Sequence, residues 1–99
     1  MLVRNNIAAC YIFKKDYDKA LEVVEEAIKV YREKEPTKRS FEKYAKVLER
    51  KGRIYHLKKD LDKAIEFYKE SLLENNVGRV SAKIRELERK KKKLEEKAY

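Results

Sequence analysis

Apolar residues recur at intervals of three and four along most of the chain with polar residues between them, which is the pattern of amphipathic helices. Four such stripes precede residue 76: Ile7, Ala8, Tyr11; Ala20, Leu21, Val24, Ala27, Ile28, Tyr31; Phe41, Tyr44, Ala45, Leu48, Gly52, Tyr55; and Leu61, Ala64, Ile65, Tyr68, Leu72. After Gly78 a fifth stripe follows, at Val80, Ile84, Leu87 and Leu94. The pattern predicts an all-α protein.

The chain contains an internal repeat. When the sequence is shifted by 44 positions, residues 11–28 match residues 55–72 at nine of 18 aligned positions. Each copy is predicted to form a helix, a short turn and a second helix. We expect a single module over residues 1–99, with a first repeat at 1–36 whose lengthened second helix ends at Pro36, a second repeat at 37–76, and a capping helix at 77–99 with a polar outer face.

Composition narrows the class of protein. Charged residues make up 45% of the chain against a typical value of about 25%, and only two Gly and one Pro interrupt it. This composition excludes a β-sandwich, a β-barrel and a disordered tail, and no apolar run approaches the roughly 20 residues of a membrane helix. The single cysteine, Cys10, cannot form an internal disulfide, and we expect it to be buried in the first helix. We therefore expect a cytoplasmic protein without a membrane segment.

Positive charge lies in the second half of the chain. Residues 1–36 hold seven basic and seven acidic side chains, residues 37–76 hold eleven and seven, and residues 77–99 hold nine and four, which gives net charges of 0, +4 and +5. Such a balance favours anionic partners. The run of four lysines at 90–93 is typical either of a nucleic-acid patch or of a solvated helix face, and the nearby glutamates favour the second interpretation.

The residue types argue against catalysis. His56 is the only histidine, so no histidine pair can hold a metal or activate a serine, and two glycines cannot form a phosphate-binding loop. The carboxylates lie among lysines on amphipathic faces, where ion pairing is their expected role. We expect a non-enzymatic protein without a metal or cofactor.

The repeats resemble the tetratricopeptide repeat family over about residues 1–73. The family's alternation of small, aromatic and large apolar residues occurs at Ala8, Tyr11, Ala20, Val24 and Ala27, and again at Gly52, Tyr55, Ala64, Tyr68 and Ser71. The family period is 34 residues, so the 44-residue spacing implies a ten-residue insertion around residues 31–39. The resemblance implies an α-solenoid of two helix-turn-helix repeats plus a C-terminal capping helix.

Two segments resemble the carboxylate-clamp members of this family, namely Asn6-Ile7-Ala8-Ala9-Cys10-Tyr11 and Tyr44-Ala45-Lys46-Val47-Leu48-Glu49-Arg50-Lys51-Gly52. The extended loop before Pro36 and the segment 63–72 are similar to the central domain of the heat-shock-organising, stress-inducible co-chaperones. By this resemblance Asn6, Lys46 and Arg50 bind the terminal carboxylates of a peptide of the Glu-Glu-Val-Asp type, from heat-shock protein 90 or 70. Phe13, Arg53 and Leu57 are possible groove contacts. The lysine and asparagine that the family supplies from a preceding repeat have no counterpart here.

Two alternatives remain open on the sequence, a tetratricopeptide module with a different peptide ligand and a capping helix that binds nucleic acid. We expect neither nucleic-acid nor membrane binding. Because the family's first repeat is missing, we expect the chain to be a fragment of a larger domain. The apolar edge formed by Leu2, Val3 and Ile7 is then expected to be exposed and to support homo-oligomerisation.

Overall fold

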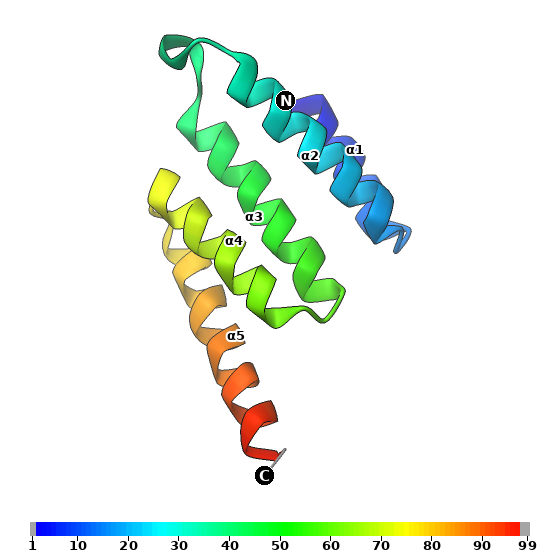
Figure 1. Ribbon diagram of the computed structural model, residues 1–99, viewed down its shortest axis with the longest axis vertical. Helices are drawn as coiled ribbons and strands as arrows, with labels where there is room; N and C mark the ends of the chain where they lie inside the picture. Colours follow the sequence, from blue (N-terminus) through cyan, green and yellow to red (C-terminus); the bar gives the residue numbers. More distant parts are fainter. Residues whose placement is uncertain (1, 98–99) are drawn as a thin grey trace.

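The computed structural model describes the backbone of residues 2–97 and the side chains of residues 7–97. Five α-helices follow one another over this range (Figure 1). They are α1 (Leu2–Phe13), α2 (Tyr17–Glu33), α3 (Phe41–Leu57), α4 (Leu61–Glu74) and α5 (Gly78–Lys97), and a short 3-10 helix, η1 (Pro36–Lys38), lies between α2 and α3. The expectation of an all-α repeat protein is confirmed.

The two helical hairpins close with the same turn. In the first, Lys15 has a positive φ of 63°, its N–H donates to the Ile12 carbonyl, and the Asp16 N–H donates to the Tyr11 carbonyl at 2.9 Å. Lys59, with φ 67°, holds the equivalent place in the second hairpin. This pair of bonds around a left-handed residue ends a helix by satisfying its last carbonyls. The 44-residue repeat therefore extends to backbone conformation.

An aspartate then starts the second helix of each hairpin. The Asp16 side chain accepts a hydrogen bond from the Lys19 N–H, and the Asp60 side chain accepts one from the Lys63 N–H at 3.2 Å. Each carboxylate satisfies a backbone donor that has no partner within the helix. The Lys-Lys-Asp segment thus serves both as the stop of one helix and as the start of the next.

Part of the longer period lies in the connection from α2 to α3, which has seven residues against three between α4 and α5. α2 ends at Glu33, three residues before the predicted end at Pro36, because the residue that precedes a proline disfavours the helical conformation. The Arg39 side chain donates to the carbonyls of Arg32 and Lys34, at 2.8 and 3.0 Å, and so covers the open end of α2. Tyr31 and Tyr44 stack with ring centroids 4.1 Å apart across the connection. The insertion is therefore fixed against the hairpins.

The core divides into two clusters that α3 connects. The first packs α1, α2 and α3 together, and the second packs α4 against α5, with Tyr55 of α3 at its edge. Between α3 and α4 the backbone approach is close, since a Cβ built on Gly52 would lie 3.0 Å from the ring of the fully buried Tyr68. The Ser71 hydroxyl donates to the Ala45 carbonyl at 2.7 Å and satisfies a buried polar group at the same contact.

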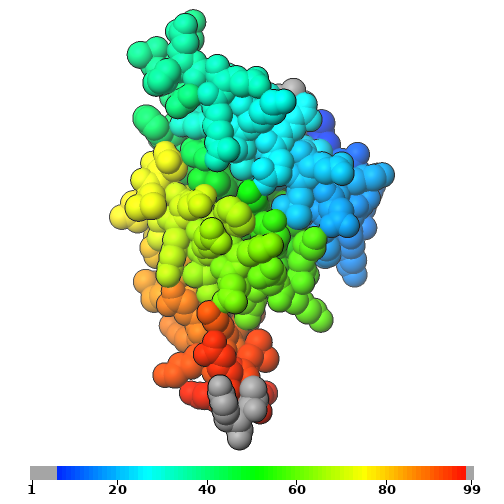
Figure 2. All heavy atoms as spheres, viewed as in Figure 1, coloured from blue at the N-terminus to red at the C-terminus, as the bar shows by residue number. Residues whose placement is uncertain are grey.

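Only the first half of α5 contributes buried apolar side chains to the contact with the second repeat. Val80, Ile84 and Leu87 are buried, but Leu94 from the same predicted stripe is 61% exposed. The end of α5 extends beyond the other helices, as Figure 2 shows in red. Lys91 of α5 forms an ion pair with Asp62 of α4 at 2.6 Å.

Two sequence expectations concern α1. Cys10 is exposed, so the prediction that it is buried was wrong. It lies two residues from both Ala8 and Ile12, which are buried, and two residues in a helix correspond to about 200°, so it faces away from the core. At the predicted apolar edge Ile7 is 42% exposed, whereas the side chains of Leu2 and Val3 lie outside the described residues. Homo-oligomerisation through this edge stays a prediction.

Candidate functional site

A pocket of about 180 Å³ lies where α3, α4 and the first half of α5 meet. Its lining side chains are mostly cationic; they are Lys46, Glu49, Arg50, Arg53, Tyr68, Arg79 and Lys83. Five cations and one carboxylate give this small space a formal charge of +4. Such a concentration of positive charge, partly shielded from solvent, favours the binding of an anion.

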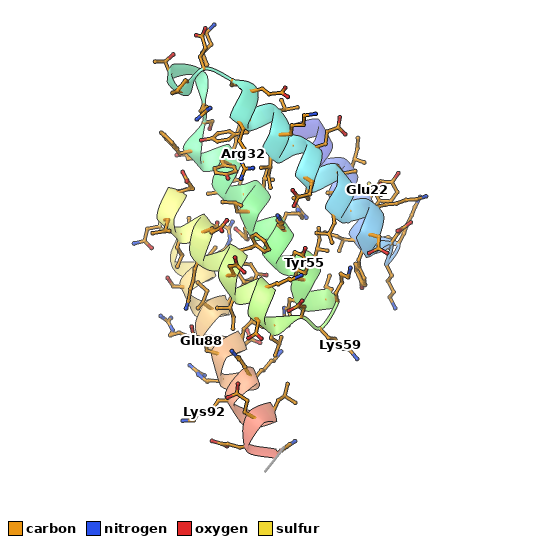
Figure 3. All side chains as sticks on the ribbon, in the orientation of Figure 1. Glu22, Arg32, Tyr55, Lys59, Glu88 and Lys92 are labelled. Carbon is orange, nitrogen blue, oxygen red and sulfur yellow. The ribbon has the colours of Figure 1, made fainter. Side chains whose placement is uncertain are left out.

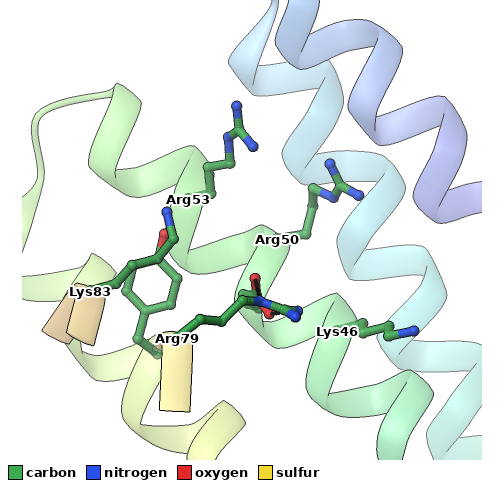
Figure 4. A pocket seen from close by; sticks show the side chains of 7 residues that line it. Lys46, Arg50, Arg53, Arg79 and Lys83 are labelled. Atoms are coloured by element: carbon green, nitrogen blue, oxygen red, sulfur yellow. Dashed lines mark hydrogen bonds and ion pairs between the residues drawn. The ribbon is translucent and has the colours of Figure 1, made fainter. Parts of the chain in front are cut away.

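Three of the cations come from one face of α3. Lys46 and Arg50 are four residues apart and Arg53 is three further on, so the helical period places them in a row, as Figure 4 shows. Burial lowers the pKa of Arg50, and the neighbouring charge of Arg53 lowers it further, against a smaller opposite effect of Glu49. Two guanidinium groups that repel each other here would be stabilised by an anion placed between them.

The other two cations come from α5. Arg79 binds Glu49 with two nitrogens, Nη2 to Oε1 at 2.8 Å and Nε to Oε2 at 3.3 Å, and this hydrogen bonding raises the pKa of Arg79. The paired geometry ties the start of α5 to α3 and holds Glu49 in place. Lys83, one turn further along α5, lines the same pocket (Figure 4). Within the described part of the chain, no acidic side chain forms an ion pair with Lys46 or Lys83.

Tyr68 of α4 contributes a buried hydroxyl. The side chain is fully buried, and its hydroxyl has no hydrogen-bond partner among the described residues. Burial, with smaller effects of Glu49 and Glu86, raises the pKa of Tyr68 to about 12, so the group stays protonated at neutral pH and can donate. A buried donor without an acceptor is unfavourable, and an oxygen-bearing ligand in the pocket would satisfy it.

The structure brings together part of the predicted site. Lys46, Arg50 and Arg53 line the pocket, whereas the side chain of Asn6 lies outside the described residues. Phe13 is 89% exposed at the end of α1 and lines none of the described pockets. Leu57 lines a separate groove near the end of α5, which is described below.

Sequence reasoning missed four lining residues, namely Glu49, Tyr68, Arg79 and Lys83. A signal existed for the pair on α5, because Arg79 and Lys83 are four residues apart on the predicted capping helix. Which face of that helix meets α3 depends on how the helices pack. The sequence pattern alone does not determine that arrangement.

Metal-binding clusters and membrane-spanning helices are both absent from the described residues. No group of three or more histidine, cysteine, aspartate or glutamate side chains within them could hold a metal ion. None of their helices is both long and apolar enough to cross a membrane.

Comparison with known proteins identifies relatives. A family model described as tetratricopeptide repeat matches residues 1–72. A solved structure described as "TPR2AB-domain:pHSP90-complex of yeast Sti1" is 33% identical with a TM-score of 0.89, covering 97% of this chain and 36% of that one. The N-terminal domain of stress-induced protein-1 (STI-1) from C. elegans is 30% identical with a TM-score of 0.76, covering 86% of this chain and 65% of that one. This chain thus spans about a third of the yeast structure's length and about two thirds of the nematode one's. No curated protein matches.

Proposed function

The chain belongs to the tetratricopeptide repeat family, and we propose that it is an adaptor module of the co-chaperone type, which binds the acidic C-terminal peptide of heat-shock protein 90 or 70. The pocket between α3 and α5 is the proposed binding site. A free C-terminal residue of aspartate presents two carboxylates, and Lys46 and Arg50 supply charge-assisted donors for them.

The observation that carries this proposal is the charge of the pocket. Five cationic side chains face about 180 Å³, with Glu49 as the only acidic lining residue among those described, and Glu49 is already bound by Arg79. Lys46 and Lys83 pair with no acidic side chain among the described residues, so a neutral peptide would leave their charges uncompensated, whereas an acidic peptide would compensate them in a partly desolvated setting. The similar yeast Sti1 structure is described as a pHSP90 complex, which supports the same partner class.

Titration with a fluorescent Met-Glu-Glu-Val-Asp peptide tests this function, with the free acid measured beside the C-terminal amide. We expect saturable binding of the acid and a marked loss of affinity for the amide, because amidation removes one of the two carboxylates. Lys46→Ala or Arg50→Ala should each weaken binding about 10- to 100-fold, the effect of losing one charge-assisted hydrogen bond.

A matched control lies on the same helix. Lys43 is exposed on α3 and does not line the pocket, so Lys43→Ala changes the net charge equally and should leave the affinity within about twofold. Equal binding of acid and amide would refute the clamp and favour a tetratricopeptide module with another peptide ligand. Equal weakening by Lys43→Ala and Lys46→Ala would mean that only overall charge matters.

A further inference from the structure

A second hollow, which we call the distal groove, lies between the end of α3, the start of α4 and the last turns of α5. Its volume is about 540 Å³, within the range of about 300–1,000 Å³ that is usual for ligand sites. Three leucines form its apolar part: Leu57, Leu61 and Leu94. Leu57 is 38% exposed and Leu94 is 61% exposed, although the pattern along α5 gives Leu94 a core position. The groove therefore presents apolar surface that nothing in the described chain covers.

Lysines surround these leucines. Lys59, from the turn between α3 and α4, and Lys90, Lys93 and Lys97, from α5, line the groove, and none of its lining residues is acidic. Among these four, within the described chain, only Lys90 forms an ion pair, with the exposed Glu86 at 3.6 Å. By contrast, Lys91 is paired with Asp62 on the α4 side of the helix. On the groove side of α5, Lys93 and Lys97 therefore have no acidic partner among the described residues.

The lysines are arranged in a line. Lys90, Lys93 and Lys97 stand at positions i, i+3 and i+7, so they share one face of α5 and extend along it for about 10 Å. Lys59 protrudes from the hairpin turn, where Figure 3 labels it. His56 also lines the groove, and burial followed by the charges of Lys90 and Lys83 lowers its pKa, against an opposite effect of Glu86. The groove is electropositive along its length and apolar between the charges.

We propose that the distal groove is a second docking site, for an acidic peptide segment that inserts an apolar side chain between Leu57 and Leu94 and places carboxylates beside the lysines. This site shares no lining residue with the pocket lined by Lys46 and Arg50, and its ligand needs no free C-terminus. The ligand is an internal stretch of a partner protein, with aspartate or glutamate on both sides of a leucine-like residue.

Charge and shape favour a peptide over other occupants. A single lipid headgroup concentrates its charge at one end, whereas the cations here are spread over about 10 Å. A nucleic acid supplies phosphates at suitable intervals but no aliphatic group to cover Leu57 and Leu94. The net charge of +9 lies entirely in residues 37–99, so a second copy that docked through that part of its surface would be repelled from the groove. An extended peptide at about 3.3 Å per residue spans the lysine line with three or four residues.

A set of acetylated and amidated fluorescent hexapeptides tests the proposal, each with one leucine, isoleucine, methionine or phenylalanine among aspartates and glutamates. We expect at least one to bind saturably in a fluorescence anisotropy titration at physiological salt. Replacing the apolar residue of that peptide by serine should weaken its binding about tenfold, because the burial of one such side chain contributes a free energy of that size. A set in which no member binds overturns the proposal.

Variants locate the site. Lys93→Glu and Leu94→Ser should each weaken the best peptide about tenfold or more, and both residues are exposed, so the fold should be retained. Lys92→Glu is the matched control, since it makes the same charge change on the neighbouring residue, which lines a different pocket. Lys46→Ala should have no effect on this peptide, and Lys93→Glu should have little effect on Met-Glu-Glu-Val-Asp. Failure of one site is then distinguishable from failure of the other.

Three results would contradict the peptide site. Equal weakening by Lys92→Glu and Lys93→Glu would show non-specific attraction. Binding of single-stranded oligouridylate that depends on Lys93 but not on Leu94, and that displaces the peptide, would assign the groove to nucleic acid. Binding of phosphatidylserine vesicles that is lost in Leu94→Ser, without any peptide binding, would assign it to a membrane surface.

Discussion

Replacing Gly52 by alanine sets two effects of similar size against each other. Alanine is favoured over glycine inside a helix by about 0.8–1.0 kcal/mol, so an exposed site would gain stability. At Gly52 the new methyl group would lie 3.0, 3.1 and 3.1 Å from three atoms of the Tyr68 ring, closer than ordinary van der Waals contact. Because that ring is fully buried, a shift of a few tenths of an ångström away from the methyl group would disturb its other packing contacts.

The steric cost should exceed the helical gain. Overpacking a well-filled contact costs about 1–3 kcal/mol, so we expect Gly52→Ala to lower the free energy of unfolding by about 1 kcal/mol. In a domain of this size that corresponds to a fall in Tm of about 4–8 °C. Urea denaturation followed by circular dichroism measures the change, and a variant as stable as the parent or more so would refute the reasoning.

Two companion variants isolate the cause. A Cβ on Gly78, at the start of α5, would meet nothing within 4 Å, so Gly78→Ala should be neutral or stabilising by up to about 0.5–1 kcal/mol. In a Tyr68→Leu background, Gly52→Ala should lose most of its cost, because the ring it contacts is gone. If the cost persisted there, the contact with Tyr68 would not be its source.

Further predictions concern single groups. Tyr68→Phe removes a buried hydroxyl without a partner among the described residues and should raise the unfolding free energy by about 1 kcal/mol, whereas a decrease in urea stability would show that the hydroxyl is hydrogen-bonded in solution. Lys59→Gly should stabilise by about 0.5–1 kcal/mol because φ is 67° there, while Lys63→Gly inside α4 should destabilise by about 1 kcal/mol in the same denaturation assay. The pKa of His56 is lowered from 6.5 in the folded state, so the unfolded chain binds the proton more readily, and stability should fall as pH drops below about 6.5. His56→Gln should remove this part of the slope in a pH series of unfolding curves, and an unchanged slope would assign it to other groups.

The sequence was sufficient for the repeats because their signals do not depend on how the helices pack. The helical stripes depend on neighbours within a few turns, and the nine matches in 18 positions come from comparing the chain with itself. The backbone of the turns was less accessible, since Lys15 and Lys59 adopt a conformation usually taken by glycine, and lysine gives no indication of it. Cys10 differs from its prediction because its angular position on α1, and not its apolar character, determines its exposure.

The residues of the candidate site also differ in whether the sequence alone could place them together. Lys46, Arg50 and Arg53 could be placed together from their spacing on one helix. Arg79 and Lys83 could not, because their approach to α3 depends on how α5 lies against the second repeat. Leu94 illustrates the converse case, in which a regular stripe predicts a buried residue but the side chain is 61% exposed at the edge of the distal groove.

The division of the core into two clusters has a consequence for the order in which the helices unfold. α3 contacts α2 on one side and α4 on the other, and the largely buried side chain of Lys51 in α3 both pairs with Glu25 of α2 and lies over the Phe67 ring of α4. α1 and the last turns of α5 lie at the two ends of this series of helices. In a structure that is held by nearest-neighbour contacts, the ends should exchange their amide hydrogens first and α3 last. The helix that supplies most of the proposed peptide contacts would then be the last to unfold.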